Sequence, residues 1–238
     1  MRRIIDAHPE WWLLLLCAFA WRGVFASVGS GIQYDICHGI RGGALTSTAA
    51  WMQLNGVESL RDWGEMTVAM MLPLAVIPAR FVAFNSFWHR RYRAMAGFTA
   101  GFLGLWLMAG SLAMAFSLLL DRMGLQNPTT TAGMFLLAMV WQRTPLKVSA
   151  VRNCHRTAVL APAGWRAELG CLRFGLSYGI QCVLSCWALM LLSATAEHQP
   201  LIMACLTVLM LFERSQWLSD KPILSRLPLL MLVWLVLH

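Results

Sequence analysis

Charged residues are scarce in this sequence of 238 residues: they make up 13% of the chain, whereas hydrophobic residues make up 58%. Soluble domains carry about a quarter charged residues, so the composition argues against an ordinary soluble protein. The charges that are present gather in short clusters between long apolar runs. The composition therefore predicts an integral membrane protein, whose formal net charge of +8 belongs to basic loops and does not indicate a nucleic-acid partner.

Motifs of hydrolytic catalysis and of phosphate binding are also missing. The sequence has no Ser-His-Asp order, no HExxH, no paired-carboxylate arrangement and no Gly-rich phosphate loop. It has no internal repeat and no separate soluble domain, which predicts a single transmembrane domain over residues 1–238. We therefore expect a protein that is not an enzyme.

Two further absences concern processing and disulfides. The apolar run that follows Arg2 and Arg3 lacks a clean small-residue cleavage site, which favours a retained signal-anchor. Of the seven cysteines only Cys37 clearly falls in an outer loop, so the sequence argues against a disulfide framework.

Seven apolar stretches are candidates for transmembrane helices, which need about 20 residues to cross the hydrocarbon layer. They are Trp11–Gly29, Gly64–Trp88, Ala96–Leu120, Ala132–Trp141, Cys171–Ala194, Pro200–Glu213 and Pro222–His238. The fourth and sixth are short, and Pro145 disfavours continuation of the fourth. We therefore predict an all-α bundle of six to seven transmembrane helices, with residues 30–63 as the main outer segment.

The distribution of basic residues predicts the orientation of this bundle. With the amino terminus in the cytoplasm, 13 of the 19 lysine and arginine residues fall on the cytoplasmic side and three in the outer loops. Cytoplasmic loops of membrane proteins carry such an excess of basic residues. We therefore expect a cytoplasmic amino terminus and an outer carboxyl terminus.

Three sulfur-containing side chains recur every four residues in the apolar run GIQCVLSCWALM, residues 179–190. This spacing puts Cys182, Cys186 and Met190 nearly on one face of a helix. Thiolate and thioether ligands are soft and select Cu(I), or Zn where all ligands are thiolates. Cysteine and methionine also serve as apolar packing residues, so the stripe alone leaves both interpretations open.

A second sulfur cluster lies in the run WGEMTVAMMLPLAVIP, which contains Met66, Met70 and Met71. Pro73 and Pro78 interrupt the same run, and each frees a backbone carbonyl that needs a partner from a neighbouring helix or water. This arrangement suits a site that lines an internal cavity, and it equally suits a kinked structural helix.

A third cluster, WQRTPLKVSAVRNCHR, contains Cys154 and His155, either of which is a candidate ligand. Arg152 and Arg156 are expected to lower the pKa of the Cys154 thiol and so to favour the thiolate. The alternative is an interfacial loop with incidental Cys and His. Further along, Glu213 closes the sixth apolar stretch, where an ionisable group suggests function unless it reaches the interface.

Five strings in a fixed order resemble a bacterial family of predicted metal-binding integral membrane proteins, long described as a domain of unknown function. The strings are MTVAMMLP (66–73), WQRTPLK (141–147), CHR (154–156), GLSYGIQCVLSCWALM (175–190) and FER (212–214). The family includes membrane partners of tyrosinases that are proposed to supply copper. The resemblance covers about residues 62–214, and its most specific parts are Ala-Met-Met-Leu-Pro and Thr-Pro-Leu-Lys.

The resemblance implies a protein of the bacterial cytoplasmic (inner) membrane that binds Cu(I) and holds or delivers it for assembly of an oxidase. The metal ligands it implies are Cys182, Cys186, Met190, Met70, Met71, Cys154, His155 and Glu213. This chain departs from the family pattern at Ala150 and Ser185, where relatives have cysteine. The remaining soft ligands are sufficient, because Cu(I) needs only two or three.

Two other functions stay open at this point. The missing cysteines favour a metal-free membrane scaffold or an assembly subunit of a membrane complex, in contact with lipid and with other subunits or copies. A small-solute transporter built on the broken fourth helix has less support, because no second, symmetric interruption accompanies it.

Overall fold

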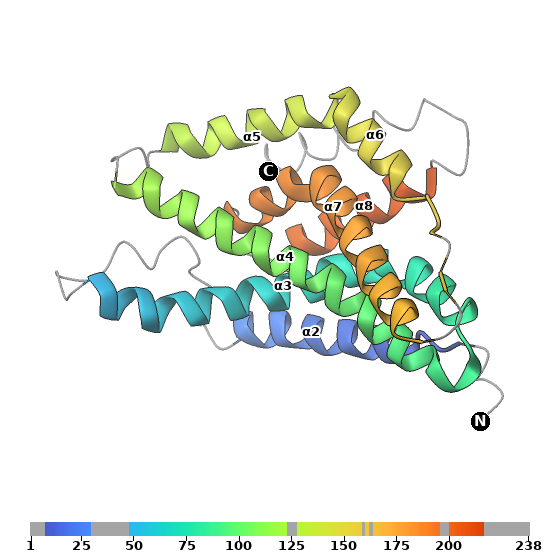
Figure 1. Ribbon diagram of the computed structural model, residues 1–238. Coiled ribbons are helices and arrows are strands. Elements are labelled where there is room, and N and C mark those ends of the chain that lie inside the picture. Colours follow the sequence, from blue (N-terminus) through green and yellow to red (C-terminus); the bar gives the residue numbers. More distant parts are fainter. Residues whose placement is uncertain are drawn as a thin grey trace.

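The structure is a computed structural model, and it describes residues 8–29, 48–122, 128–158, 160–161, 164–195 and 200–216. Regular structure in these ranges is helical and includes no strand, which confirms the all-α fold class (Figure 1). The helices are α2 (Trp11–Gly29), α3 (Thr48–Phe84), the 3-10 helix η1 (Trp88–Arg90), α4 (Arg91–Arg122), α5 (Pro128–Gln142), α6 (Pro145–Asn153), α7 (Trp165–Thr195) and α8 (Pro200–Gln216).

Three helical stretches of the described chain are long and apolar enough to cross a membrane: Leu60–Phe84, Trp88–Phe116 and Trp165–Leu191. The apolar part of α2, Trp11–Ala26, is shorter. The expected seventh span, Pro222–His238, lies outside the described residues, so the count of six to seven spans and the orientation stay predictions.

The structure differs from the sequence prediction within residues 30–63 and agrees with it at Pro145. The segment 30–63 was expected to be a loop, yet α3 already begins at Thr48. Residues 48–63 contain no proline, and their single glycine, Gly56, lowers the helix propensity without ending the helix. The expected break at Pro145 is confirmed, because α5 ends at Gln142 and α6 begins at Pro145.

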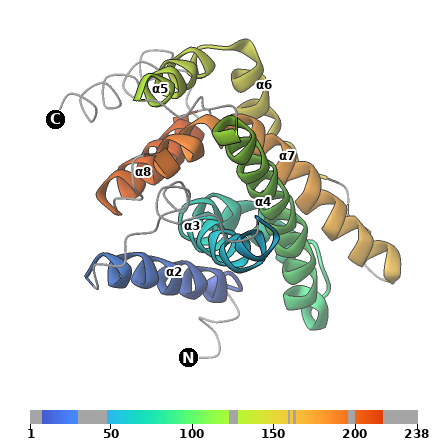
Figure 2. The ribbon, with the colours of Figure 1, turned by 90° about the vertical axis from the view of Figure 1, so that its left-hand side faces the viewer.

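Helix α3 lies in the middle of the bundle and packs against α2, α4 and α8 (Figure 2). Helix α7 packs most extensively on α4, and α5 and α6 lie against α7. The α4–α7 contact depends on small residues, since a Cβ on Gly175 would lie 2.1 Å from the Phe98 carbonyl oxygen. Glycine there allows the two backbones to approach closely, as in many membrane helix pairs.

The first proline of α3 creates a backbone acceptor that α2 fills. Pro73 has no N–H, so the carbonyl of Ala69 has no partner within the helix. Trp21 of α2 donates its Nε1–H to this carbonyl at 2.9 Å, and the Cys17 thiol lies 3.5 Å from it. The expectation that neighbouring helices satisfy the freed carbonyls is therefore confirmed at this position.

Candidate metal centre

Three buried thiols from two helices come together beside α8. Cys182 and Cys186 lie one turn apart on α7, and Cys154 is the C-cap residue of α6. The Cys186 thiol interacts with the thiols of Cys182 and Cys154. Helix α6 thus brings Cys154 to the sulfur stripe of α7, whereas the sequence alone gave no distance between them.

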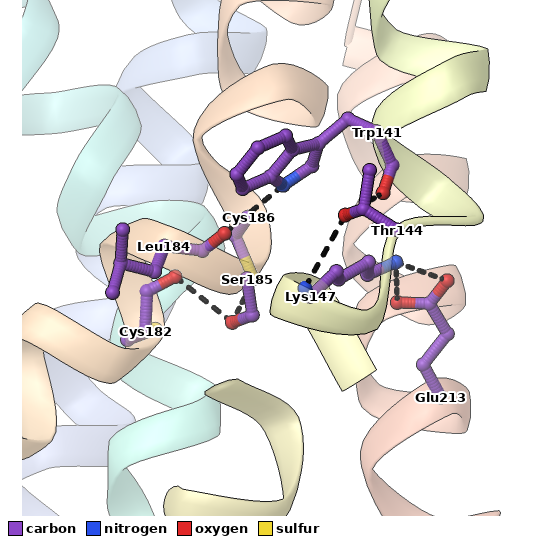
Figure 3. A network of polar contacts seen from close by, with 8 residues as sticks. All are labelled: Trp141, Thr144, Lys147, Cys182, Leu184, Ser185, Cys186 and Glu213. Carbon is purple, nitrogen blue, oxygen red and sulfur yellow. Dashed lines mark hydrogen bonds and ion pairs between the residues drawn. The ribbon is translucent and has the colours of Figure 1, made fainter. Parts of the chain in front are cut away.

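Ser185 lies inside this thiol cluster (Figure 3). Its hydroxyl lies 3.0 Å from the Cys182 carbonyl oxygen and 3.3 Å from the Cys186 sulfur. The Ser185 hydroxyl also lowers the pKa of the Cys154 thiol. The residue at which the resemblance implies a cysteine therefore places a hydroxyl beside two of the thiols.

The second proline of α3 connects the helix to the thiol cluster. Pro78 leaves the carbonyl of Leu74 without a partner in α3. Tyr178 of α7 donates its hydroxyl to this carbonyl at 2.7 Å, and Arg214 of α8 donates to it at 3.1 Å. Arg214 also donates to the Tyr178 hydroxyl oxygen, and its guanidinium lies 4.9 Å from the centre of the Tyr178 ring. Through these two hydrogen bonds, the freed carbonyl of Leu74 links α3 to both α7 and α8.

Arg214 is the cation of the thiol cluster. Its guanidinium interacts electrostatically with the thiols of Cys154, Cys182 and Cys186. In the string FER the sequence pattern indicates Glu213 as a candidate ligand and gives no role to the arginine beside it. No local pattern could have identified Arg214, since its partners come from three other helices.

Glu213 forms an ion pair with Lys147 and both of its oxygens are engaged (Figure 3). Lys147 Nζ donates to them at 2.8 and 2.7 Å, and the lysine side chain is only 6% exposed. Thr144 accepts a hydrogen bond from the Lys147 backbone N–H and caps α6, with Pro145 in the first turn. The residues of the string Thr-Pro-Leu-Lys therefore form the start of α6, and the lysine links this helix to α8 by an ion pair.

The pKa of the Cys154 thiol differs from the sequence expectation. Burial raises it above its ordinary value, and the nearby Arg214 only partly opposes this rise. The predicted lowering of this pKa is therefore wrong, because burial of the thiol outweighs the nearby positive charge, and both Arg152 and Arg156 are exposed. Desolvation of a thiol disfavours the thiolate unless a metal or a close cation compensates.

His155 is exposed directly after the buried Cys154. Burial of part of its ring and the neighbouring Arg214 charge lower the pKa of His155, while a hydrogen bond to the Arg214 backbone opposes them. At neutral pH its imidazole is thus available as a neutral nitrogen ligand next to the thiol.

The three methionines among the predicted ligands are fully buried. Met70 and Met71 lie about one turn before Leu74 on α3, and Met190 lies one turn after Cys186 on α7. These side chains belong to the same hydrophobic core as Cys182 and Cys186.

In the described part of the chain, no group of three His, Cys, Asp or Glu side chains has a geometry that would hold a metal ion. The close pair is Cys182 and Cys186, with Cys154 beside it and methionine sulfurs in the same buried cluster. A thiol pair supplemented by thioether is a donor set for Cu(I), which accepts few and soft ligands.

These features define a helical protein with apolar helices long enough to cross a membrane and a buried thiol pair beside an arginine. The family model of the PpoB2 copper chaperones matches residues 60–238, so the chain belongs to this copper chaperone family. The suspected resemblance to copper-handling membrane proteins is thereby confirmed. No curated protein and no solved structure gives a significant match.

Proposed function

We propose that this protein is a multi-pass protein of the bacterial inner membrane that binds Cu(I) and delivers it for the assembly of a copper-dependent oxidase. The observation that carries the proposal is the buried thiol pair Cys182–Cys186, which Cys154 joins from a separate helix. Membership in a copper chaperone family supports copper as the cargo. Delivery of a bound ion involves no turnover of substrate, in agreement with the missing catalytic motifs.

The proposed binding mode uses the two thiolates of α7 as the primary ligands. Cu(I) prefers soft donors and is stable with two or three of them, so a third ligand can come from a methionine. Met70, Met71 and Met190 are the methionine candidates, since all three side chains are fully buried in the same core cluster.

The proposed route to this pair passes through Cys154 and His155. His155 is exposed, Cys154 is buried and interacts with Cys186, and the two residues are neighbours in the chain. This order of ligands, from exposed to buried, lets an ion move by exchange of one ligand at a time, from a surface imidazole to a buried thiol pair. Glu213 is assigned no ligand role here, because Lys147 engages both of its oxygens.

Elemental analysis of the detergent-purified protein after Cu(I) loading tests this proposal. We expect about one copper per chain in the wild type and none above background in a Cys182→Ser, Cys186→Ser double variant. A Cys17→Ser, Cys205→Ser double variant is the matched control, since it removes two thiols from α2 and α8 and should keep the copper. Equal copper in all three proteins would contradict the ligand assignment.

A metal-free scaffold is the second candidate, and one observation favours it. The described residues contain no three-ligand group of His, Cys, Asp or Glu, which agrees with the serine at position 185, where the resemblance implies a cysteine. Under this alternative the purified wild type would bind no copper and would co-purify with subunits of a membrane complex.

A further inference from the structure

Among the residues that the structure describes, the charges of the ionisable side chains beside the thiol cluster do not cancel. Lys147 interacts electrostatically with Cys186, but Glu213 neutralises it at 2.8 and 2.7 Å. The guanidinium of Arg214, in contrast, donates to the Leu74 carbonyl and the Tyr178 hydroxyl, which are neutral acceptors. Lys147, Glu213 and Arg214 together therefore leave one positive charge beside the thiols.

A single positive charge beside the thiols balances a metal complex whose net charge is −1. Two thiolates with a monovalent cation carry a net charge of −1, which Arg214 balances to zero. Two thiolates with a divalent cation are already neutral, so the arginine would remain uncompensated in a partly buried position. Uncompensated buried charge is costly, and the match between charges therefore distinguishes the two metals.

We propose that Arg214 is a specificity-determining residue: its fixed positive charge makes the Cys182–Cys186 pair selective for a monovalent soft cation over a divalent one. This inference rests on the proposed function, because it presumes that the thiol pair binds metal. Arg214 acts through its charge and is no ligand, since a guanidinium offers hydrogen-bond donors and no lone pair.

The geometry also makes Arg214 suitable for substitution. Tyr178 alone still donates to the Leu74 carbonyl at 2.7 Å when the guanidinium is removed, so this carbonyl keeps a partner. Arg214→Gln removes the charge and retains a polar side chain, whereas Arg214→Lys retains the charge. Arg166→Gln is the matched control, because it removes an exposed positive charge at the start of α7.

The experiment measures Cu(I) affinity of the full-length protein in detergent by competition with a chromophoric Cu(I) chelator. Zn(II) affinity is measured in parallel with a zinc indicator. For Arg214→Gln we expect Cu(I) binding weakened by about 10- to 100-fold, the scale of one charge interaction at an effective dielectric near 20. Zn(II) binding should remain equal or become tighter, and Arg214→Lys and Arg166→Gln should retain most of the preference for Cu(I).

The outcomes separate this proposal from the proposed function. A wild type that binds no Cu(I) contradicts the proposed function itself. A wild type that binds Cu(I) with a selectivity that Arg214→Gln leaves unchanged contradicts only the role of Arg214. Thermal unfolding of each variant in detergent checks folding, and equal weakening of Cu(I) and Zn(II) would mean a structural role and would also overturn the proposal.

Discussion

The ion pair between Lys147 and Glu213 provides the sharpest prediction for the architecture around the thiols. The two side chains are 6% and 17% exposed, and Lys147 Nζ lies within 2.8 Å of both carboxylate oxygens. Removing one partner of a buried pair costs about 3–5 kcal/mol, because the other charge stays buried without compensation. Since Glu213 keeps some access to solvent, we expect about 2–3 kcal/mol for Lys147→Met.

This loss converts to a change in melting temperature. For a chain of this size, 1 kcal/mol corresponds to roughly 2–4 °C, so the unfolding midpoint of Lys147→Met should fall by about 4–12 °C. The assay is thermal unfolding in detergent, followed by circular dichroism. The double variant Lys147→Met, Glu213→Leu removes both charges and should recover most of the loss. If the double variant is as unstable as Lys147→Met, an unpaired buried Glu213 is not the cause of the lowered unfolding midpoint.

Three further predictions concern the thiols and the helix contacts. Ser185→Cys places a thiol where a hydroxyl lies 3.3 Å from the Cys186 sulfur, and we expect Cu(I) binding tighter by roughly tenfold or more in chelator competition; unchanged affinity would contradict the assigned position of Ser185. Gly175→Ala should lower stability by about 1–3 kcal/mol, because its Cβ would lie 2.1 Å from the Phe98 carbonyl oxygen. Gly104→Ala, with no atom within 4 Å of the new Cβ, should be tolerated, and equal melting temperatures of the two variants would contradict this difference. Burial raises the pKa of the Cys154 thiol above its ordinary value, so the folded state favours the protonated thiol. Stability from this group is therefore fully present below the ordinary pKa of a thiol and is lost as the pH rises through the raised pKa, and Cys154→Ala should flatten that alkaline loss in unfolding measurements.

The apolar pattern of the sequence predicts most of the fold. Long apolar runs predict the helices, and the missing N–H of Pro145 predicts the break between α5 and α6, since both depend on local chemistry. The sequence also predicts that Pro73 and Pro78 free carbonyls that need partners. It cannot predict that Trp21 and Tyr178 are those partners, because these contacts join residues 48 and 104 positions apart.

The sequence predicts which cysteines of the candidate site are neighbours, but it does not predict the charged group beside them. The spacing of Cys182 and Cys186 identifies them as neighbours on one helix face. The pKa of Cys154 was predicted in the wrong direction, because burial of the thiol raises this pKa more than the positive charge of Arg214 lowers it. Burial and partners of ionisable groups depend on tertiary packing, which a local pattern does not contain.

X-ray absorption at the copper edge of the Cu(I)-loaded protein tests whether the thiol pair binds the ion. We expect a Cu(I) edge with two or three sulfur neighbours, and loss of this sulfur shell in the Cys182→Ser, Cys186→Ser variant. A copper site with only nitrogen and oxygen neighbours, or a sulfur shell that the double variant retains, would contradict it.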